Sequence, residues 1–326
     1  MDKPILDPPQ DPWDAFQADL RRIAGSPATV LIEGEGGAGK SRAAIELHRR
    51  GPSPEGPLVV VDLGALPPTL VEGELFGHEE GAFTGATHAR LGRFRRAHGG
   101  TIVLEGIDRL PADIQGKLLR VLQEREVEPL GSEQPVPVDV RVLATSASDL
   151  ASDVERGTFR EDLFFRLAVV RLRVPPLRAR GEGILALAEQ LLDEVGSRLG
   201  LSGRELGDGA RERLIAHPWP GNVRELENAL ERVIVLGGSD PGKGPITADE
   251  LAFLEEPLEG AADRIAGEVL SHGVSLEELD FAVLRRALDE ARGNLSAAAR
   301  SLGLSRRAFE YRWKKVAGAS GDDDSP

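Results

Sequence analysis

The strongest constraint on the fold is a glycine-rich segment near the start of the chain. It matches the phosphate-binding pattern G-x-x-x-x-G-K-[ST] at Gly34, Glu35, Gly36, Gly37, Ala38, Gly39, Lys40 and Ser41. An apolar run at residues 29–33 precedes the segment, and a helical pattern follows it as far as Arg49. In such a loop, backbone N–H groups and the helix amino terminus hold phosphate oxygens. A turn matching by chance would lack this context, so we predict phosphate binding.

Two side chains of this loop are expected to act on a nucleotide directly. Lys40 would reach the outer phosphates, and the Ser41 hydroxyl would help to hold Mg²⁺. The strand that should bring acidic groups to the loop ends in Glu105 and Gly106. A nucleotide hydrolase normally ends this strand with two carboxylates, one for the metal and one for the attacking water. The sequence therefore predicts a phosphate-binding loop beside a strand that lacks one of the two carboxylates used for nucleotide hydrolysis.

Alternating strand and helix patterns indicate the fold class. Further short strands are predicted at residues 58–62, 101–105 and 139–145. Helices are predicted at residues 13–23, 114–124, 184–199, 205–216 and 223–236. Strands that alternate with helices favour an α/β domain with a parallel sheet. After Pro175 and Pro176 only helical patterns follow, which predicts a helical lid, and Asn222, three residues before Glu225, is the expected cap of its last helix.

The chain is expected to contain several segments with different compositions. They are an amino-terminal extension (1–25), the α/β subdomain (26–175), the lid (176–240), a Gly- and Pro-rich linker (241–275), an all-α unit (276–317) and a disordered acidic tail (318–326). A short helix is possible within the linker at residues 248–254. We expect no receiver or sensory domain in front, because the first strand begins near residue 29. Control would then act in trans or through expression.

Composition limits the compartment and the partners. The chain has no cysteine, which fits a reducing cytoplasm. Its first residues are acidic and rich in proline rather than apolar, so no signal peptide is expected. No apolar run approaches the roughly 18 residues of a membrane helix. We therefore expect a cytoplasmic protein with no membrane partner. The net charge of −14 is uneven, since Arg285–Lys315 contains nine Lys or Arg against three Asp or Glu. This asymmetry favours a basic binding module on an acidic body.

The basic stretch has the pattern of a helix-turn-helix. Alanines at residues 297–299 permit close helix crossing, Gly303 makes the turn, and Ser305 caps the second helix. The candidate DNA-binding residues are Ser305, Arg306, Arg307, Arg312, Lys314 and Lys315. A basic helix that is merely solvated is the alternative, and the charge asymmetry argues against it. We predict a module that binds double-stranded DNA.

A second segment carries a resemblance to a known family. Residues 74–79 (ELFGHE) are followed by Gly81, Ala82, Phe83, Thr84, Gly85 and Ala86. By physics alone this would be a surface turn with a partly buried ring. The string resembles the GAFTGA loop of bacterial enhancer-binding proteins, the AAA+ activators of sigma-54 RNA polymerase. The resemblance implies that this loop contacts the sigma factor and transmits ATP-driven movement.

The resemblance extends over about residues 10–240 and resumes at 276–317. It implies an AAA+ domain that binds ATP with Mg²⁺, followed by a Fis-type DNA-binding domain. Within residues 159–167, Arg160 and Arg166 resemble arginine fingers that act on a neighbouring subunit. Within residues 218–226, Arg224 resembles a sensor aimed at the nucleotide. Isolated arginines would more often form surface ion pairs. Fingers that act between subunits imply self-association into a ring, by resemblance a hexamer.

Three departures from the family pattern concern one pocket. The family ends the acidic strand with Asp-Glu where this chain has Glu105-Gly106, and it has Asn at the position of Asp62. Its first sensor, Ala-Thr-Asn, is replaced at residues 145–147, which end in Ala147. Glu105 can still serve Mg²⁺, but loss of a general base typically costs about 10²- to 10⁴-fold in rate. Asp62 is a candidate for a relocated carboxylate, and slow or absent hydrolysis is expected.

Three functions remain open from the sequence. The chain is a working sigma-54 activator, or a pseudo-ATPase that binds nucleotide and DNA without turnover, or a subunit of mixed rings. In the last case it would supply Arg160 and Arg166 to the pocket of a competent activator while its own pocket is silent. ATP turnover separates the first function from the other two. Mixed assembly with a competent activator separates the second from the third.

Overall fold

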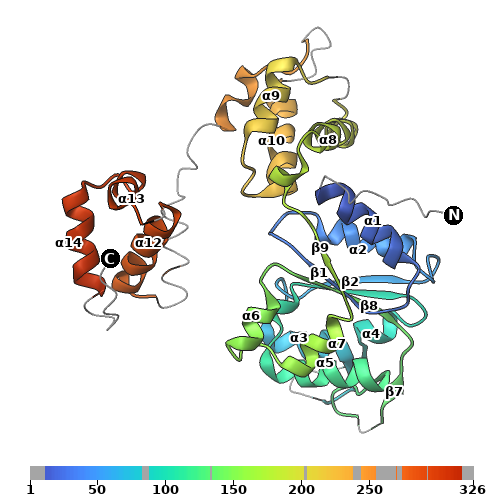
Figure 1. Cartoon of the computed structure of the whole chain (residues 1–326). Coiled ribbons are helices and arrows are strands. Elements are labelled where there is room, and N and C mark those ends of the chain that lie inside the picture. Colours follow the sequence, from blue (N-terminus) through green and yellow to red (C-terminus); the bar gives the residue numbers. More distant parts are fainter. Residues whose placement is uncertain are drawn as a thin grey trace, which may run out of the picture. The chain divides into compact units, whose positions relative to one another are not determined.

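The computed structural model describes most of the chain. It covers residues 12–82, 88–132, 134–201, 204–237, 244–254, 269, 274–291 and 293–317. The side chains of residues 315–317 are not described. The chain divides into two compact units, residues 1–252 and 253–326 (Figure 1). Among the described residues, no helix combines the length and the apolar composition that crossing a membrane requires.

A five-stranded sheet forms the centre of the first unit. Its strands are β1 (Val30–Glu33), β2 (Leu58–Asp62), β5 (Thr101–Glu105), β8 (Arg141–Ser146) and β9 (Val170–Arg173). Their order is β2-β5-β8-β1-β9, and each neighbouring pair is parallel. The predicted α/β class is therefore confirmed. The sequence-based reading missed β9, an edge strand in which Arg171 and Arg173 interrupt the apolar pattern.

The strands bury both faces because apolar side chains alternate between two cores. Leu31, Ile102 and Leu104 belong to the larger core. Ile32 and Val103, their sequence neighbours, belong to the smaller core on the opposite face. This alternation explains why residues 102–104 of β5 are all apolar, and Glu105 follows them as the last residue of the strand.

Helices cover both faces of the sheet (Figure 1). On the smaller core lie α1 (Pro12–Ala24) and α2 (Lys40–Arg49). On the larger core lie α3 (Pro68–Phe76), α4 (Arg93–Arg96), α5 (Ala112–Glu124), α6 (Leu150–Glu155) and α7 (Glu161–Leu167). The 3₁₀ helix η1 (Ile107–Arg109) follows β5. Two short antiparallel pairs complete this part, β3 (Gly77–His78) with β4 (Arg90–Leu91) and β6 (Glu126–Val127) with β7 (Val136–Pro137).

The remainder of the first unit is helical, as predicted. Its elements are η2 (Leu177–Arg180), α8 (Gly183–Leu199), α9 (Asp208–Ala216), α10 (Asn222–Gly237) and the 3₁₀ helix η3 (Asp249–Leu254). The predicted start of α9 was wrong by three residues, because Leu206 pairs with Ile246 in a β-bridge and Gly207 is the N-cap that precedes the helix. The short helix expected at 248–254 is a 3₁₀ helix rather than an α-helix.

Among its described residues, the second unit contains the helices α12 (Leu276–Glu290), α13 (Leu295–Ser301) and α14 (Arg306–Ala317). Ser275 and Glu278 form a capping box at the start of α12. Phe309 of α14 is fully buried in a small core with Leu284 and Ala298. The predicted turn and cap are confirmed, since Gly303 has φ 66° and the Ser305 hydroxyl accepts a hydrogen bond from Ala308 N at 3.2 Å.

Candidate nucleotide, sigma-factor and DNA sites

The glycine-rich loop connects β1 to α2 and has the backbone shape that phosphate binding requires. Gly37 and Gly39 adopt left-handed φ values of 72° and 101°, which glycine reaches without the steric cost that Cβ imposes. No side chain caps the amino terminus of α2 in the described structure. Its first N–H groups are therefore available to an anion, and the helix dipole adds a favourable potential there.

Lys40 points back along the loop. Its Nζ donates hydrogen bonds to Gly34 O at 2.7 Å and to Glu35 O at 2.8 Å. Burial lowers the pKa of Lys40, while the carboxylates of Asp108, Glu105 and Glu35, in that order, oppose the shift. The ammonium group thus lies in a partly desolvated site where the charges of three carboxylates and of Arg224 act on it. A phosphate fits this site, because it would supply the charge partner that two carbonyl oxygens supply only in part.

The acidic strand ends directly beside β8. Glu105 is half-buried and pairs in register with Thr145. Gly106 follows with φ 68°, and its N–H donates to Thr145 Oγ1 at 3.3 Å. The chain therefore leaves the sheet in a left-handed turn at the position where the sequence lacks its second carboxylate. A Cβ on Gly106 would meet no atom closer than Arg109 Cδ at 3.8 Å, so the turn has space for a side chain.

Asp62 ends the neighbouring strand β2 in register with Glu105. Its Oδ1 accepts a hydrogen bond from Gly64 N at 2.9 Å, which turns the carboxylate toward its own loop. The residue is exposed. In the sheet order, two strands separate β2 from β1, the strand that leads to the phosphate loop. Asp62 thus borders the vacated position from the side of the sheet away from Lys40.

The lid joins the phosphate loop through Asn222 at the start of α10. Asn222 Nδ2 donates to Glu35 Oε2 at 3.0 Å and to Gly36 O at 3.1 Å, and its Oδ1 accepts from Leu177 N at 2.8 Å. Arg178 adds a two-point ion pair to Glu35, with N–O distances of 2.8 and 2.5 Å. The bonds from Arg178 and then from Asn222 lower the pKa of Glu35 to about 2.

The predicted capping role of Asn222 was wrong. Asn222 is buried with φ 55°, and its side chain is occupied by the phosphate loop and by η2 instead of its own helix. Glu225 Oε2 accepts from Gly221 N at 2.7 Å and provides the local contact at this helix start. The tertiary contacts prevail because they satisfy a buried backbone N–H at Leu177 that has no helical partner.

A cavity of about 270 Å³ lies beside Ala38 and Gly39. Trp13 and Phe16 of α1, Arg180 of η2, Leu187 of α8 and Val223 of α10 are among its lining residues. The Arg180 guanidinium lies 3.9 Å from the centre of the Trp13 ring, and its Nη2 donates to Ala38 O at 2.5 Å. Burial lowers the pKa of Arg180 to about 10. The cavity therefore has an aromatic and apolar lining next to the loop.

The three arginines predicted for the site differ in their surroundings. Arg224 lies against the phosphate loop, since a Cβ on Gly37 would be 3.3 Å from Arg224 Cβ. Arg160 is exposed and forms a two-point ion pair with Asp162, at 3.0 and 2.8 Å. Arg166 donates from Nε and Nη2 to Leu122 O, at 3.1 and 2.8 Å. In the described structure, only Arg224 of the three is brought to the loop of its own chain.

The loop that resembles GAFTGA is described only at its base, because Phe83, Thr84, Gly85 and Ala86 lie outside the described residues. Gly81 has φ 79°. A Cβ on Gly131, in the turn between β6 and β7, would lie 2.8 Å from Ala82 Cβ. The base of the loop thus packs on this turn, and Glu79 N donates to Leu130 O at 2.9 Å in the same contact.

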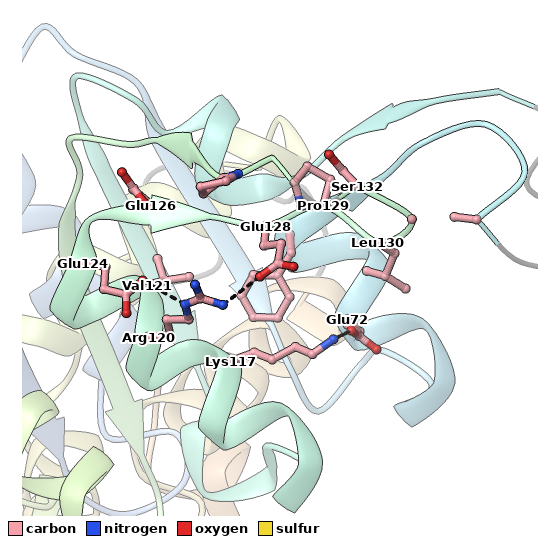
Figure 2. A pocket seen from close by; sticks show the side chains of 14 residues that line it. Glu72, Lys117, Arg120, Val121, Glu124, Glu126, Glu128, Pro129, Leu130 and Ser132 are labelled. Carbon is pink, nitrogen blue, oxygen red and sulfur yellow. Dashed lines mark hydrogen bonds and ion pairs between the residues drawn. The ribbon is translucent and has the colours of Figure 1, made fainter.

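A cavity of about 410 Å³ opens beside this contact, between α3, α5 and the β6–β7 turn. Arg120 lies 2.8 Å from Glu124 and 2.8 Å from Glu128, and Lys117 is paired with Glu72 (Figure 2). None of its lining residues belongs to the phosphate loop. The cavity is therefore separate from the nucleotide site and lies beside the base of the loop that resembles GAFTGA.

The basic helix α14 presents one exposed face. Arg307, Tyr311 and Lys314 are exposed and spaced so that they share this face. Arg306 is exposed but pairs with Glu310 at 2.8 Å, and Arg312 lies 3.5 Å from Asp280 of α12. The side chain of Lys315 lies outside the described residues.

Comparison with known proteins identifies the family. The family described as the sigma-54 interaction domain matches residues 10–173, the AAA+ ATPase lid domain matches 178–254, and the bacterial regulatory protein Fis family matches 275–315. The chain is 42% identical to the response regulator protein PilR of Pseudomonas aeruginosa, over 94% of this chain and 68% of PilR. The chain belongs to the sigma-54-dependent transcriptional activators.

Other members of the family are similar over the same region. The Nif-specific regulatory protein of Azotobacter vinelandii is 43% identical, over 90% of this chain and 55% of that protein. The crystal structure of NtrX from Brucella abortus has a TM-score of 0.68 and 32% identity, and covers 93% of this chain and 67% of NtrX. NtrX has also been solved in complex with ATP and with ADP. The chain thus spans about half to two thirds of the length of these relatives.

Several residues at this activator's site were missed by the sequence-based reading. Asp108, Arg178, Arg180 and Trp13 all contact or face the loop region, and none belongs to a recognised motif. Only Asp108 left a signal in the sequence, since it is a carboxylate two residues after the vacant Gly106. The others could not be found because their partners lie far along the chain.

Proposed function

We propose that this sigma-54 family member binds ATP·Mg²⁺, contacts sigma-54 RNA polymerase through residues 81–86 and binds double-stranded DNA through α14. Lys40 carries the proposal. Its ammonium group is partly desolvated and is hydrogen-bonded to two loop carbonyls at 2.7 and 2.8 Å. Such a group gains most from a phosphate that brings several strong acceptors at once.

The nucleotide would lie across the carboxyl edge of β1, β8 and β5. The loop N–H groups and Lys40 would hold the phosphates, and the adenine ring would enter the aromatic cavity beside Gly39. Ser41 and Glu105 would hold Mg²⁺ together with phosphate oxygens. The described residues contain no cluster of three or more His, Asp or Glu that could hold a metal. In the proposed site, phosphate oxygens complete the coordination of Mg²⁺. Mg²⁺ when bound neutralises charge on the phosphates.

Hydrolysis is proposed to be slow. Gly106 cannot accept a proton, and Ala147 provides no polar group where the family has its first sensor. Arg224 would report the state of the nucleotide to the lid through its contact with the loop. Arg160 and Arg166, on the α7 segment, would act on a neighbouring subunit in a ring, proposed to be a hexamer in the cytoplasm.

The base of the loop at residues 81–86 supports a role in transmission. Ala82 packs on the β6–β7 turn and Glu79 bonds to Leu130. These contacts tie the base of the loop to the β6–β7 turn, and we propose that a movement of one is passed to the other. Phe83 and Thr84 are the proposed contacts with the sigma factor.

A subunit of mixed rings is the second candidate. It is favoured by Gly106, which impairs the chain's own pocket, together with the retained Arg160 and Arg166. In such a ring the chain would complete the pocket of a competent activator while turning over little ATP itself.

The test measures nucleotide binding and turnover in the same preparation. A fluorescent ATP analogue should bind to the wild type with Mg²⁺, and Lys40→Ala should weaken binding at least tenfold, because the main phosphate cation is lost. Lys314→Ala, an exposed lysine of α14, is the matched control and should bind like the wild type. Absence of nucleotide binding by the wild type would refute the proposed function.

Contact with the sigma factor needs its own measurement. Sigma-54 should be retained by the wild type in the presence of a nucleotide transition-state analogue, and Thr84→Ala should reduce retention. Thr69→Ala, an exposed threonine of α3, is the matched control. Equal retention by both variants would place the contact elsewhere. Mixing the Lys40→Ala protein with a competent activator then tests for mixed rings. A change in total ATP turnover would indicate mixed rings, and an unchanged turnover would indicate separate ones.

A further inference from the structure

Gly106 follows β5 where a nucleotide hydrolase normally has its second carboxylate, so hydrolysis in this chain requires another carboxylate that faces the phosphates. The carboxyl edge of the sheet brings β5 next to β8, and β8 next to β1, which leads into the phosphate loop. A side chain that turns from the end of β5 toward β8 therefore approaches the phosphate loop. A side chain on β2 lies on the other side of β5.

Asp108 makes this turn toward β8. It belongs to η1, and its Oδ1 accepts hydrogen bonds from Ala147 N at 3.4 Å and from Ser146 Oγ at 3.1 Å, whose hydroxyl proton is shared with Ser148 O at 2.9 Å. Ser146, the last residue of β8, is fully buried. In the part of the chain that the structure describes, both hydrogen bonds go to Oδ1 and none to Oδ2. The carboxylate is thus held at one oxygen and keeps the other as an acceptor.

The left-handed turn at Gly106 produces this placement. With φ 68° at Gly106, the chain reverses after β5, and Arg109 N donates back to Gly106 O at 2.9 Å. This tight turn sets Asp108 beside the end of β8. The glycine that removes one carboxylate from the strand end is therefore the residue that allows another to reach the same edge.

The electrostatics of Lys40 are consistent with this geometry. Burial lowers the pKa of Lys40, and Asp108 is the acid that opposes the shift most, ahead of Glu105. Asp62 is not among the groups that dominate this shift. Asp62 is also exposed and bonded to Gly64 N, whereas Asp108 is half-buried.

We propose that Asp108 is the carboxylate that activates water for ATP hydrolysis in this chain. The inference rests on the proposed function, since it requires ATP in the pocket. The water oxygen bonds to the γ-phosphorus as its proton passes to Asp108 Oδ2. The bond between the γ-phosphorus and the β–γ bridging oxygen breaks, and ADP leaves with its electron pair. Ser146 is a positioning residue that holds Asp108 Oδ1.

The experiment compares turnover with affinity in full-length variants. Asp108→Asn should lower kcat by about 10² or more, the cost of losing a general base. The same variant should bind a non-hydrolysable ATP analogue as tightly as the wild type or more tightly, because a negative charge near the phosphates is removed. Asp108→Glu should recover part of kcat. Ser146→Ala should lower kcat several-fold, since Ala147 N remains as a donor.

Control and competing variants decide the assignment. Asp113→Asn removes an exposed carboxylate from the first turn of α5 and should leave both kcat and affinity unchanged. Loss of turnover in Asp62→Asn with turnover retained in Asp108→Asn would overturn the inference, as would a wild type that binds ATP without any turnover. A wild type that binds no nucleotide would refute the proposed function instead. If Asp108→Asn loses both nucleotide affinity and thermal stability, Ser146→Ala and Asp108→Glu decide the assignment. An unchanged kcat in both of these variants would overturn the inference.

Discussion

Asn222 Nδ2 donates a hydrogen bond to Glu35 Oε2 at 3.0 Å, which joins the first turn of α10 to the phosphate loop across 187 residues of sequence. The same side chain accepts from Leu177 N at 2.8 Å. One buried amide therefore connects the loop, η2 and the lid. A nucleotide that moved Glu35 would act directly on the lid.

Asn222→Ala is expected to destabilise the protein by about 1–3 kcal/mol, because the buried Leu177 N–H loses its acceptor. Alanine also strains the positive φ of 55°, which adds about 1–2 kcal/mol. Asn222→Gly should remove the bonds without that strain. Asn228→Ala, an exposed asparagine of the same helix, is the control. Chemical unfolding measures all three, and equal stability of Asn222→Ala and Asn228→Ala would show that the contact is weak.

The Glu35 carboxylate makes stability depend on pH. Bonds from Arg178 and Asn222 lower its pKa from 4.5 to about 2, so its stabilising contribution is present above pH 4.5 and is lost as the pH falls toward 2. Both partners of the ion pair are over a third exposed, at 42% and 47%, so solvent screening limits the gain to about 1 kcal/mol or less. The stability gap between wild type and Glu35→Gln should therefore shrink on acidification. Glu55→Gln, an exposed change, should show a constant gap in unfolding titrations.

Substitution of Gly106 should cost conformational energy rather than packing energy. Gly106→Ala is expected to destabilise by about 1–2 kcal/mol, because φ is 68° while no atom lies within 3.4 Å of a new Cβ. Gly116→Ala, in the middle of α5 with open space around it, should instead stabilise by about 0.5–1 kcal/mol. Thermal unfolding compares the pair. A larger loss in Gly106→Ala would indicate a clash.

Restoring the family residues should raise turnover only in combination. Gly106→Glu alone is expected to restore little, since the left-handed turn does not continue β5 and the sensor position holds Ala147. Combined with Asp62→Asn and Ala147→Asn, it should restore more. Steady-state ATP turnover of the single and triple variants provides the measurement. Full recovery with the single change would contradict this account.

DNA recognition should depend unequally on two adjacent arginines. Arg307 is exposed on the face it shares with Tyr311, whereas Arg306 is paired with Glu310 at 2.8 Å. Arg307→Ala should cost about 1–3 kcal/mol on a specific site and relax sequence preference, if it contacts guanine. Arg306→Ala should cost less, because its ion pair must first open. Arg286→Ala on α12, also in an ion pair, is the control for charge, and binding titrations at two salt concentrations separate base contacts from phosphate contacts.

The sequence predicted the strands whose signal lies in neighbouring residues. The strands at Leu58–Asp62 and Thr101–Glu105 have the predicted bounds, because β-branched runs and flanking turn residues are properties of neighbouring positions. The two-residue strands, such as β6, were not found, since so short a pairing leaves no periodic signal. The hydrogen bonds of Asn222 and Asp108 were not found either, because both residues have partners distant in the chain.

The sequence by itself determined the phosphate loop, the α/β class, the helical lid and the helix-turn-helix, since these depend on residue types at fixed spacings. Only the tertiary structure decided that Asn222 holds Glu35 rather than capping its helix. Only it decided that Asp108 is hydrogen-bonded at the end of β8, the strand that lies next to β1. The physical reason is the same in both cases. Hydrogen bonds and charges act over a few ångströms in space, and the chain brings together in space residues that its sequence separates.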